Sequence, residues 1–515
     1  MQIKKPELNL SSTVWVILIA AAIKFALHLY LAPGYGYFAD EFYSIILSRH
    51  LALGYVDVPP LTPALVALSQ ALLGQSLFAL RIFPALAGAF TLVFVCLITR
   101  ELGGKTFAVG LSALIFIFLP LWLMLDSIFC YDSIDQLILA GFLFTLVRFL
   151  RSGERKLWIV MGGIAGVACM TKMTIPFLAP GFLLALLISK YRRDLLTPWP
   201  WLGGVLCLAI LSPYIIWQIN NNWLTLEYWQ NYSNIRLYKF DFLQFLINIF
   251  AYLNPLLLPI WLIGLYRLFR PFKGKNYIFL AVLFIATMGV MFYFRAAARM
   301  IGELFIPLIA ASSIFLEEII PERGWFKAIR VTVTTYILAV GLFVVPIALP
   351  IMPFQYSKIF SNLAKPVMVS VHESMAGISH ESVFLTGRLG WEEMVKAVAD
   401  VYYGLPPEER AVAGIYADWY TRAGAIDVLG QQYGLPPTVS GSLTYYVWGP
   451  QYTWDVMVVV DSKVNSLDMF FEECERKAVV KNDYNKMMLG DPNIYVCRKP
   501  KISPEEIWRS IKSFR

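Results

Sequence analysis

Nine acidic side chains within residues 1–350, a region that is otherwise strongly apolar, are the residues best suited to do chemistry. A carboxylate at membrane depth is costly, so acids next to apolar segments usually line a polar cavity that binds substrates or moves protons. All nine fall at the same end of the apolar segments, which predicts one cavity opening on one side of a membrane. They are Asp40, Glu41, Asp57, Asp126, Asp132, Asp135, Glu227, Asp241 and Glu303.

The densest group of acids lies between the first two apolar segments. Asp40 and Glu41 belong to Gly-Tyr-Phe-Ala-Asp-Glu-Phe-Tyr at 36–43, and Asp57 belongs to Gly-Tyr-Val-Asp-Val-Pro-Pro-Leu at 54–61. Apolar residues between these stretches repeat at helical spacing, which predicts an amphipathic helix in the membrane interface and a second one over 62–73. The first acids would begin the first helix, whose dipole favours negative charge there. Capping of that helix is therefore the alternative to a catalytic role.

Three basic side chains at the same end of the apolar segments, Lys172, Arg295 and Arg299, are suited to bind an anion such as a phosphate. Arg295 and Arg299 are four residues apart in Arg-Ala-Ala-Ala-Arg, which predicts that they share one helical face. The small alanines between them would leave both accessible. Anchoring to lipid headgroups is the alternative for the two arginines.

The remaining polar residues predict a structural ion pair and include no known motif for a metal ion or a nucleotide. Lys24 and His28 lie four apart inside the first apolar segment, and we expect them to pair with an acid. The sequence has no cluster of His and Cys at metal-ligand spacing, no glycine-rich phosphate loop and no nucleotide motif. We therefore infer no nucleotide site, no nucleic-acid partner and no required metal ion.

The composition is that of a membrane protein. Of the 515 residues, 58% are hydrophobic and 15% are charged, and the mean hydropathy is +0.61. Soluble domains carry about 25% charged residues, so a single soluble domain is excluded. Residues 1–350 hold 26 basic and 16 acidic side chains, whereas residues 351–515 hold 17 and 19. This division predicts a basic membrane domain followed by a nearly neutral soluble domain.

Eleven apolar segments of the membrane domain are candidates to cross a hydrocarbon layer of about 30 Å. The predicted fold is therefore a polytopic α-helical membrane domain over 1–350, with a first outer loop at 33–77. The fifth and sixth segments are short and could form one broken element. The segments lie near 12–32, 78–99, 107–125, 132–149, 157–171, 175–189, 199–217, 242–266, 277–294, 302–316 and 331–350.

The distribution of Lys and Arg between the two sides of the membrane predicts the orientation. With the N-terminus in the cytoplasm, 18 basic residues of the membrane domain lie on the cytoplasmic side and seven on the other. The expected protein is a multi-pass protein of the plasma (inner) membrane whose residues 351–515 are extracytoplasmic. The first segment is not expected to be a cleavable signal, because no small-residue cleavage site follows it.

Residues 351–515 alternate helical periods with short apolar runs, which predicts a small α/β domain. Cys474 and Cys497 are its only cysteines. An oxidising exterior would allow them to pair, and two unpaired buried thiols are the alternative. The helical periods cover 392–403 and 420–433, and the apolar runs cover 411–416, 456–460 and 493–497.

The acids and basic residues occur within an ordered set of motifs that resembles one protein family. The set contains the Asp-Glu pair, the Gly-Tyr-Val-Asp-x-Pro-Pro-Leu stretch, Arg-x-x-Pro-Ala-Leu-Ala-Gly at 81–88, Tyr-Asp-Ser at 131–133 and Met-Thr-Lys at 170–172. It is similar to the GT-C membrane glycosyltransferases of the protein O-mannosyltransferase and lipid A aminoarabinose transferase type. Segments 417–430 and 435–450 resemble a bacterial branch of this group. Each motif alone is weak, but the ordered set covers most of the chain.

The resemblance implies transfer of a sugar from a polyprenyl-phosphate carrier to an acceptor on the outer face, usually with inversion at the anomeric carbon. A phosphate leaving group needs charge stabilisation, whereas an acceptor hydroxyl must lose its proton to one well-placed carboxylate. The first acid of the family pair implies that Asp40 is the general base. Glu41 would orient Asp40 or bind the acceptor.

Further positions are carried over from the family one by one. Asp57 and Asp132 match family acids that would position sugar or acceptor, with capping or burial in an ion pair as the alternative. Lys172 matches a family lysine and could hold the lipid phosphate with Arg295 or Arg299. Aminoarabinose relatives commonly have a lysine before the Pro-Pro pair, where this chain has Val58. That departure weakens any phosphate or metal role for this loop.

Two other functions compete with sugar transfer. A transporter or flippase for lipid-linked sugars usually shows paired halves with broken helices at matching positions, and no internal repeat is found here. A catalytically idle assembly subunit would not need Asp40. The sugar and the acceptor, which could be a lipid, a polysaccharide or a protein, are not predicted, and some relatives carry a metal ion.

Overall fold

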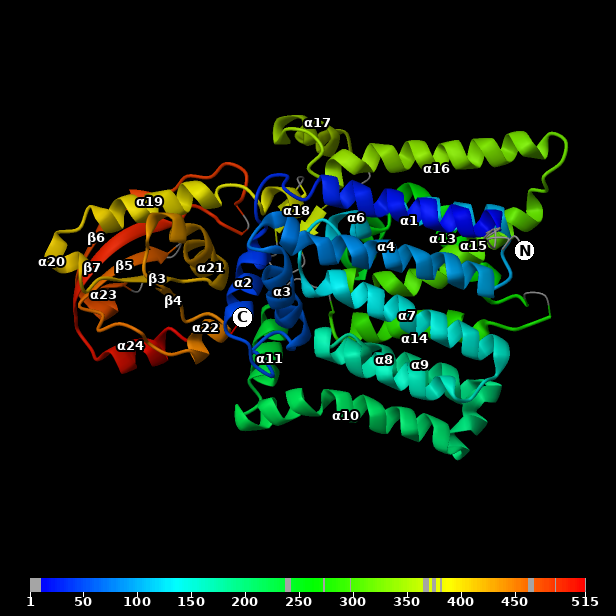
Figure 1. Cartoon of the computed structure of the whole chain (residues 1–515), viewed down its shortest axis with the longest axis horizontal. Coiled ribbons are helices and arrows are strands. Elements are labelled where there is room, and N and C mark those ends of the chain that lie inside the picture. The colour runs from blue at the N-terminus through cyan, green and yellow to red at the C-terminus, as the bar shows by residue number, and fades with distance from the viewer. Residues whose placement is uncertain are drawn as a thin grey trace, which may run out of the picture.

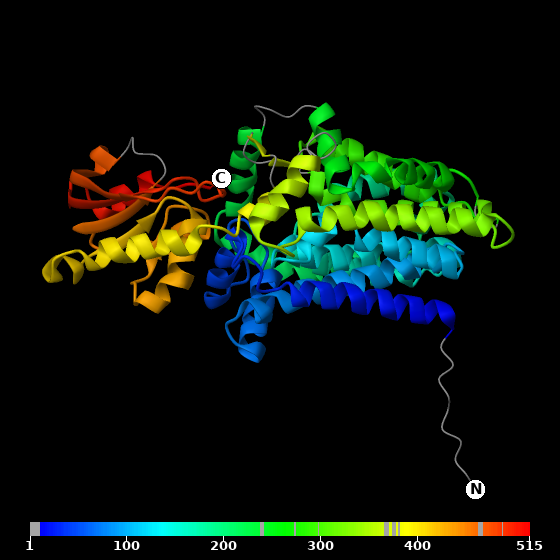
Figure 2. The same ribbon diagram turned by 90° about the horizontal axis from the view of Figure 1, so that it is seen from above.

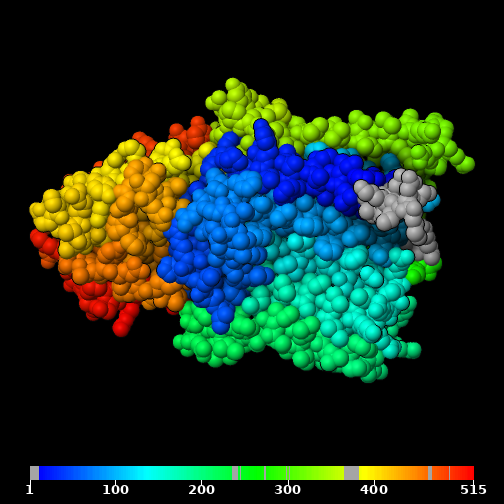
Figure 3. All heavy atoms as spheres, in the orientation of Figure 1, coloured from blue at the N-terminus to red at the C-terminus, as the bar shows by residue number. Residues whose placement is uncertain are grey.

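The computed structural model describes residues 11–236, 242–271, 274–296, 298–364, 370–372, 377–379, 382–461, 467–486 and 488–514. Asp241, one of the nine acids, lies outside these residues. The described chain forms a helical bundle and a C-terminal α/β part, with α2 (Ala39–Arg49), α3 (Leu61–Leu73) and α11 (Leu224–Arg236) between them (Figure 1). The view from above shows the same arrangement (Figure 2). In the space-filling view, α2 and α3 close the gap between the two parts (Figure 3).

Helices occupy each of the eleven apolar segments. The fifth and sixth segments form two separate helices, α8 and α9. Among the described residues, five helices are long and apolar enough to cross a membrane, or seven if two bent pairs each count as one span. Eleven crossings therefore stay a prediction. The helices are α1 (Ser12–Tyr30), α4 (Leu77–Glu101), α5 (Thr106–Ile117), α7 (Tyr131–Ser152), α8 (Leu157–Thr171), α9 (Ile175–Ile188), α10 (Pro198–Asn220), α12 (Phe242–Tyr252) with α13 (Leu258–Leu268), α14 (Ile278–Tyr293), α15 (Ile306–Ile319) and α16 (Phe326–Ala348).

Short elements connect these helices, and one of them carries Arg299 and Glu303. The segment η3 (Ala298–Phe305) precedes α15, and α6 (Pro120–Leu125) precedes the turn into α7. The others are η1 (Lys190–Leu196) and η2 (Pro255–Leu257).

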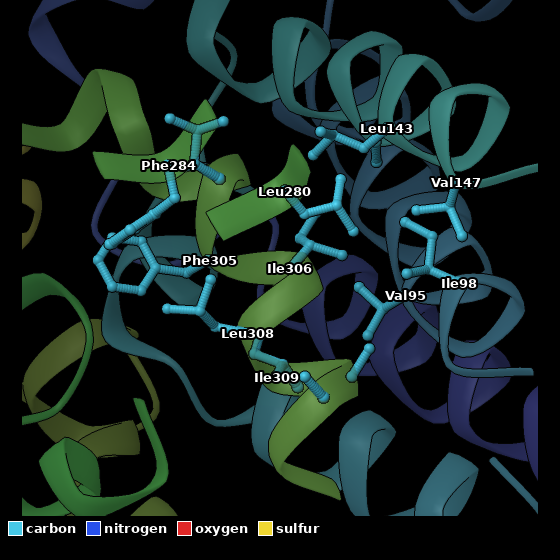
Figure 4. Packing of buried hydrophobic residues seen from close by; sticks show 14 of the residues in the cluster. Val95, Ile98, Leu143, Val147, Leu280, Phe284, Phe305, Ile306, Leu308 and Ile309 are labelled. Carbon is cyan, nitrogen blue, oxygen red and sulfur yellow. The ribbon is translucent and has the colours of Figure 1, made fainter. Parts of the chain in front are cut away.

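Apolar side chains and small residues hold the bundle together. Figure 4 shows side chains of α4, α7, α14 and α15 meeting in the largest apolar cluster. Between α8 and α10 the backbones touch, because a Cβ on Gly162 would come within 2.1 Å of the Gly203 carbonyl oxygen. A Cβ on Gly264 would likewise come within 2.3 Å of the Leu308 carbonyl oxygen. Such close approach through small residues is the usual way in which helices associate where lipid removes the hydrophobic driving force.

The helix α2 confirms the predicted element but differs in its surroundings. It begins one residue before Asp40, as the sequence indicates. Its apolar residues Phe42, Ile45 and Leu47 are buried, and its second side packs against α21 (Tyr420–Leu429) of the C-terminal part. A Cβ on Gly424 of α21 would lie 3.0 Å from Cβ of Phe42, so the two helices are in direct contact. The one-sided apolar pattern did not predict this second buried side, because its partner lies far away in the sequence.

The C-terminal part contains a five-stranded mixed sheet in the order β4-β3-β5-β7-β6. The strand β3 is parallel to β4 and β5, whereas β7 is antiparallel to β5 and β6. Buried Val458, Val460, Ile494 and Val496 of the two central strands form its core. The sheet strands are β3 (Gly414–Ala417), β4 (Thr438–Val439), β5 (Val456–Asp461), β6 (Phe471–Val479) and β7 (Asn493–Pro500).

Helices of the C-terminal part pack on this sheet, and a small hairpin contacts α12 of the bundle. The hairpin pairs β1 (Ser370–His372) with β2 (Gly377–Ser379). Cys474 of β6 lies opposite Cys497 of β7, and the two form a disulfide, one of the two alternatives left open by the sequence. The remaining helices are α17 (Phe354–Ala364), α18 (Val383–Thr386), α19 (Trp391–Tyr403), α20 (Pro407–Arg410), η4 (Gly430–Tyr433), α22 (Thr444–Val447), α23 (Leu467–Phe470) and α24 (Pro504–Ser510).

Candidate active site

Asp40 lies in the first turn of α2, where the bundle meets the C-terminal part. Its carboxylate is partly exposed, and Oδ1 accepts a hydrogen bond of 3.1 Å from the Tyr420 hydroxyl group at the start of α21. Burial raises the pKa of Asp40 above its ordinary value, while the bond from Tyr420 and the nearby Arg299 guanidinium oppose this increase. Asp40 is thus a partly buried carboxylate whose orientation is fixed by the bond from Tyr420.

Glu41, the next residue, is directed elsewhere. Its fully buried carboxylate accepts bonds from Arg81 Nε (2.8 Å) and Nη2 (2.6 Å). The backbone amides of Phe38 (2.7 Å) and Phe129 (2.8 Å) donate to it as well. We call Glu41, Arg81 and these two amides the Glu41 tether. It joins the first turn of α2 to α4 and to the turn before α7, and it includes the capping bond that the sequence offered as an alternative. Of the two predicted roles of Glu41, this arrangement fits the orientation of Asp40.

Asp57 lies close enough to Asp40 for their charges to interact. Its Oδ1 accepts a bond of 2.8 Å from the Tyr43 hydroxyl group of α2. The same hydroxyl group lies 2.8 Å from Thr444 Oγ1 of α22, whose own hydroxyl proton can be donated to Tyr43. Burial raises the pKa of Asp57 to about 7. Asp57 can therefore carry a proton near neutral pH, and it faces the Asp40 region from the same side as the C-terminal part.

A cluster of opposite charges lies on the bundle side of Asp40. Asp132, at the start of α7, forms ion pairs with Lys172 after α8 and with Arg299 of η3, whose Nε is 3.4 Å from Oδ2. The side chains of Asp132, Lys172 and Arg299 are 10%, 12% and 25% exposed. We call these three residues the Asp132 cluster. Both Asp132 and Arg299 are near enough to Asp40 to act on its charge.

Arg295 does not share a helical face with Arg299, and this prediction is wrong. The helix α14 ends at Tyr293, and Arg295 follows in a turn with a left-handed backbone (φ 52°). Arg299 belongs to η3, a separate element. The four-residue spacing indicates a common face only where the helix is continuous.

Other acids of the predicted cavity have different roles. Asp126 is fully buried and pairs with Lys24 at 2.6 Å, which confirms the predicted pairing of Lys24. His28 contacts the Lys24 carbonyl oxygen at 2.9 Å. Asp135 accepts a bond of 2.8 Å from Thr174, and buried Glu303 lies near it, beside the Asp132 cluster. Glu227 is at the surface, where it pairs with Lys512 at 2.7 Å.

Sequence reasoning missed the residues that the C-terminal part contributes. Tyr420 bonds to Asp40, and Thr444 bonds to Tyr43 and to the Val56 amide. Arg388 donates to the Gly34 carbonyl oxygen at 3.1 Å and to Ser127 Oγ at 2.7 Å. It therefore links the segment before α2 to the turn before α7, next to the Glu41 tether. Tyr420 lies in segment 417–430, which resembles the bacterial branch, and that motif was the one available signal.

The described residues contain no group of three or more His, Cys, Asp or Glu side chains arranged to hold a metal ion. The Asp132 cluster contains one acid and two basic side chains, a composition suited to an anion. A carboxylate base next to an anion site can remove a proton from one molecule while the basic residues hold the phosphate of another.

Comparison with known proteins shows which proteins this chain is similar to. A family model described as dolichyl-phosphate-mannose-protein mannosyltransferase matches residues 57–217. The lipid A galacturonosyltransferase RgtD of Rhizobium johnstonii is 23% identical over 434 residues, which are 80% of this chain and 86% of RgtD. These matches support a GT-C glycosyltransferase of the protein O-mannosyltransferase and ArnT type.

Solved structures show the same fold as this glycosyltransferase. ArnT from Cupriavidus metallidurans bound to undecaprenyl phosphate aligns with a TM-score of 0.59 at 14% identity, over 94% of this chain and 98% of ArnT. The apo form of ArnT aligns with a TM-score of 0.58 at 13% identity, over 95% and 98% of the two chains. The glycosyltransferase therefore shares the ArnT fold over nearly its whole length.

Proposed function

We propose that this glycosyltransferase moves a sugar from a polyprenyl-phosphate carrier to a hydroxyl group of an acceptor on the extracytoplasmic side of the plasma membrane, with inversion at the anomeric carbon. The matched family is named for a dolichyl-phosphate sugar, and the ArnT structure holds undecaprenyl phosphate. The observation that carries the proposal is the position of Asp40 beside the Asp132 cluster, at the bundle end that the C-terminal part covers.

Asp40 is the proposed general base. Tyr420 bonds to Oδ1, and among the described residues Oδ2 has no hydrogen-bond partner, so Oδ2 can accept the proton of an acceptor hydroxyl group. A raised pKa suits this role, because a base works best when its pKa lies near the operating pH. The Glu41 tether holds the turn from which Asp40 projects. Asp57, through Tyr43, would orient the acceptor or the transferred sugar.

The Asp132 cluster is the proposed phosphate site. Asp132 holds Lys172 and Arg299 in place before the donor arrives, so little order has to be created when the phosphate binds. The phosphate then accepts charge-assisted bonds from the same two side chains, which stabilise the negative charge that develops as the sugar–phosphate bond breaks. Arg295 remains a proposed contact to the carrier, from its turn beyond α14.

Inversion is part of the proposal, and the hydrogen bonding of Glu41 supports it. Retention through a covalent intermediate needs a second carboxylate as nucleophile. Glu41 is the carboxylate nearest to Asp40 in the sequence, but it already accepts four hydrogen bonds and is fully buried. A single displacement, with Asp40 deprotonating the attacking hydroxyl group and the phosphate leaving from the opposite face, requires only the groups described.

The proposed reaction is tested with purified full-length protein and labelled donors. Sugars on undecaprenyl phosphate and the same sugars as nucleotide derivatives are offered together with a lipid and glycan extract of the cell envelope. Label should pass to the extract only from the lipid-linked donors. Transfer from nucleotide sugars, or release of free sugar without an acceptor product, would contradict the proposal.

The proposed orientation is tested separately. Ser503 is exposed at the start of α24, so a Ser503→Cys variant should react with an impermeant thiol reagent in cells whose outer barrier, if present, is permeabilised. Labelling that requires rupture of the plasma membrane would place the C-terminal part and the site in the cytoplasm.

A further inference from the structure

A second concave site lies at the other end of α2, where the C-terminal part covers it. The pocket has a volume of about 210 Å³. One wall comes from the end of α2, with Arg49 and His50, and the other comes from the segments 427–438 and 445–451. Part of this second wall belongs to segment 435–450, a family motif to which the proposed reaction assigns no role.

An aromatic wall and two amides give the pocket the chemistry of a sugar site. The rings of His50 and Trp448 lie 4.5 Å apart, tilted by 33°, and Tyr445 meets Trp448 edge-on at 5.0 Å. Gln431 and Gln451 are exposed at the pocket. Aromatic faces pack against the C–H surface of a sugar ring, while amide groups exchange hydrogen bonds with its hydroxyl groups.

The charge in the pocket favours an anion. Asp427 is the acid of the lining, but its carboxylate is already bonded to the Thr438 amide (2.7 Å) and to the Tyr445 hydroxyl group (2.6 Å). Arg49 is exposed, and its Nη1 makes a long contact of 3.4 Å to the Asp427 carbonyl oxygen. Most of its guanidinium donors can therefore reach a ligand. A carboxylate or phosphate group on a sugar is the anion that a fork of such donors binds well.

Both walls of the pocket lead to the candidate active site. Asp40 and Arg49 lie nine residues apart on α2, which corresponds to about 14 Å along the helix. Asp427 belongs to α21, and the first residue of that helix, Tyr420, bonds to Asp40. The Asp132 cluster, in contrast, lies on the bundle side of Asp40. A molecule held in the pocket thus lies along α2 from Asp40, whereas the phosphate site is formed by residues of the bundle.

We propose that this pocket binds an anionic sugar unit of the acceptor, a unit other than the one that receives the new sugar. The identification of the ligand as part of the acceptor rests on the proposed function, but the binding itself does not depend on it. The pocket is of the order of one sugar ring in size, and the distance along α2 leaves room for a further unit between it and Asp40. The acceptor is accordingly a saccharide or glycolipid with a carboxylate or phosphate group.

The binding is tested without any transfer step, with the full-length protein in detergent and small probes observed by saturation-transfer NMR. The probes are glucose, glucuronate, glucose 6-phosphate and inorganic phosphate at millimolar concentration. We expect saturation transfer to glucuronate or glucose 6-phosphate, with the two anions showing which acidic group is preferred, and weaker transfer to glucose. Binding of inorganic phosphate as strong as that of glucose 6-phosphate would overturn the assignment, and so would absence of binding by both anionic sugars.

Variants then locate the binding. Arg49→Gln should weaken the anionic probes by roughly tenfold or more and leave glucose unchanged, because it removes charge-assisted bonds. Trp448→Ala should weaken all three sugars, whereas Trp448→Phe keeps an aromatic face and retains most of the binding. Arg509→Gln, at an exposed arginine of α24, is the matched control. Equal binding in Arg49→Gln, Trp448→Ala and wild type would place the ligand elsewhere.

Asp40→Asn separates this inference from the proposed function. The variant should bind the probes as the wild type does, since the pocket does not use Asp40. If transfer fails in every assay while binding persists, the pocket stands and the reaction is wrong. If transfer proceeds and Arg49→Gln changes neither probe binding nor the KM of any acceptor, the reaction stands and the pocket assignment is wrong.

Discussion

The Glu41 tether and the Asp132 cluster use the same kinds of side chain for different ends. In the tether, the side chains of Glu41 and Arg81 are 0% and 1% exposed. Each oxygen of the Glu41 carboxylate accepts one hydrogen bond from Arg81 and one from a backbone amide. In the Asp132 cluster, the side chains keep 10% to 25% exposure, and one acid is shared by two basic residues. Saturation and dryness make a charged group structural, whereas a surplus of charge with access to solvent makes it available to a ligand.

The same contrast separates two adjacent residues. Asp40 and Glu41 follow each other on α2, and successive residues of a helix point in directions about 100° apart. Glu41 points into the bundle and is satisfied there. Asp40 points toward the boundary with the C-terminal part, where Tyr420 supplies one bond and leaves the second oxygen for a substrate.

The largest effect on activity is expected from Asp40→Asn. The amide keeps the size of the side chain and is itself a good helix cap, but it cannot accept the proton. Single-turnover transfer should fall by about 10²–10⁴-fold, while folding and donor binding remain normal. Asp400→Asn, in an exposed ion pair of α19, serves as control and should transfer at the wild-type rate. Near-normal transfer by Asp40→Asn would exclude this acid as the base and direct attention to Asp57 and Asp132.

The largest effect on stability is expected from Arg81→Met. It leaves Glu41 as a buried charge with only two amide donors, which should destabilise the protein by about 3–5 kcal/mol. Glu41→Gln combined with Arg81→Met removes the isolated charge and should recover part of that loss. Thermal unfolding in detergent, followed by circular dichroism, measures both. If Arg81→Met alone were as stable as the wild type, the distinction between the tether and the cluster would be removed.

The Asp132 cluster should give the opposite result, lost activity with retained fold. Lys172→Ala and Arg299→Ala each remove a charge-assisted bond to the donor phosphate, worth about 1.5–3 kcal/mol. We expect kcat/KM for the donor to fall roughly ten- to hundredfold, with an unfolding temperature near that of the wild type. Lys396→Ala, at an exposed lysine, is the control. Equal donor turnover in both cluster variants would exclude them as the phosphate site.

The contrast also explains what the sequence could and could not predict. Local signals were sufficient for the helical segments, for the acids in the first turn of α2, and for the apolar strands β5 and β7. The strand β6 was not predicted, since Phe-Glu-Glu-Cys-Glu-Arg-Lys-Ala-Val carries charges on both of its faces and has no apolar alternation. Arg295 was placed on a helix that ends before it. The Arg295 pattern failed at the boundary of an element, whereas β6 had no apolar pattern by which it could be recognised.

Contacts between distant parts of the chain could not be predicted at all. Tyr420 lies 380 residues after Asp40, and its role follows only from the packing of α21 on α2. Asp40 and Glu41 also looked equivalent, because both are acids in the first turn of a helix. Only their partners, Tyr420 for one and Arg81 for the other, distinguish the proposed base from the residue that positions it.

Tyr420→Phe should have the smallest effect, and it tests whether the C-terminal part belongs to the active site. The bond from Tyr420 stabilises the charged form of Asp40 and so lowers its pKa, against the increase caused by burial. Loss of that bond should raise the pKa of Asp40 further. Since Asp40 must be deprotonated to act as a base, the acidic limb of the pH–rate profile should move to higher pH. A hydrogen bond to a charged group contributes about 1.5–3 kcal/mol. Only the part of the pKa increase that lies above the operating pH reduces the rate, so transfer at neutral pH should fall by no more than roughly tenfold. Raising the pH should restore most of this loss, which a merely structural defect would not allow.

Tyr484→Phe, at an exposed tyrosine, should leave the profile unchanged. An unmoved acidic limb in Tyr420→Phe, with the rate reduced equally at every pH, would assign Tyr420 to packing and separate the C-terminal part from the chemistry at Asp40.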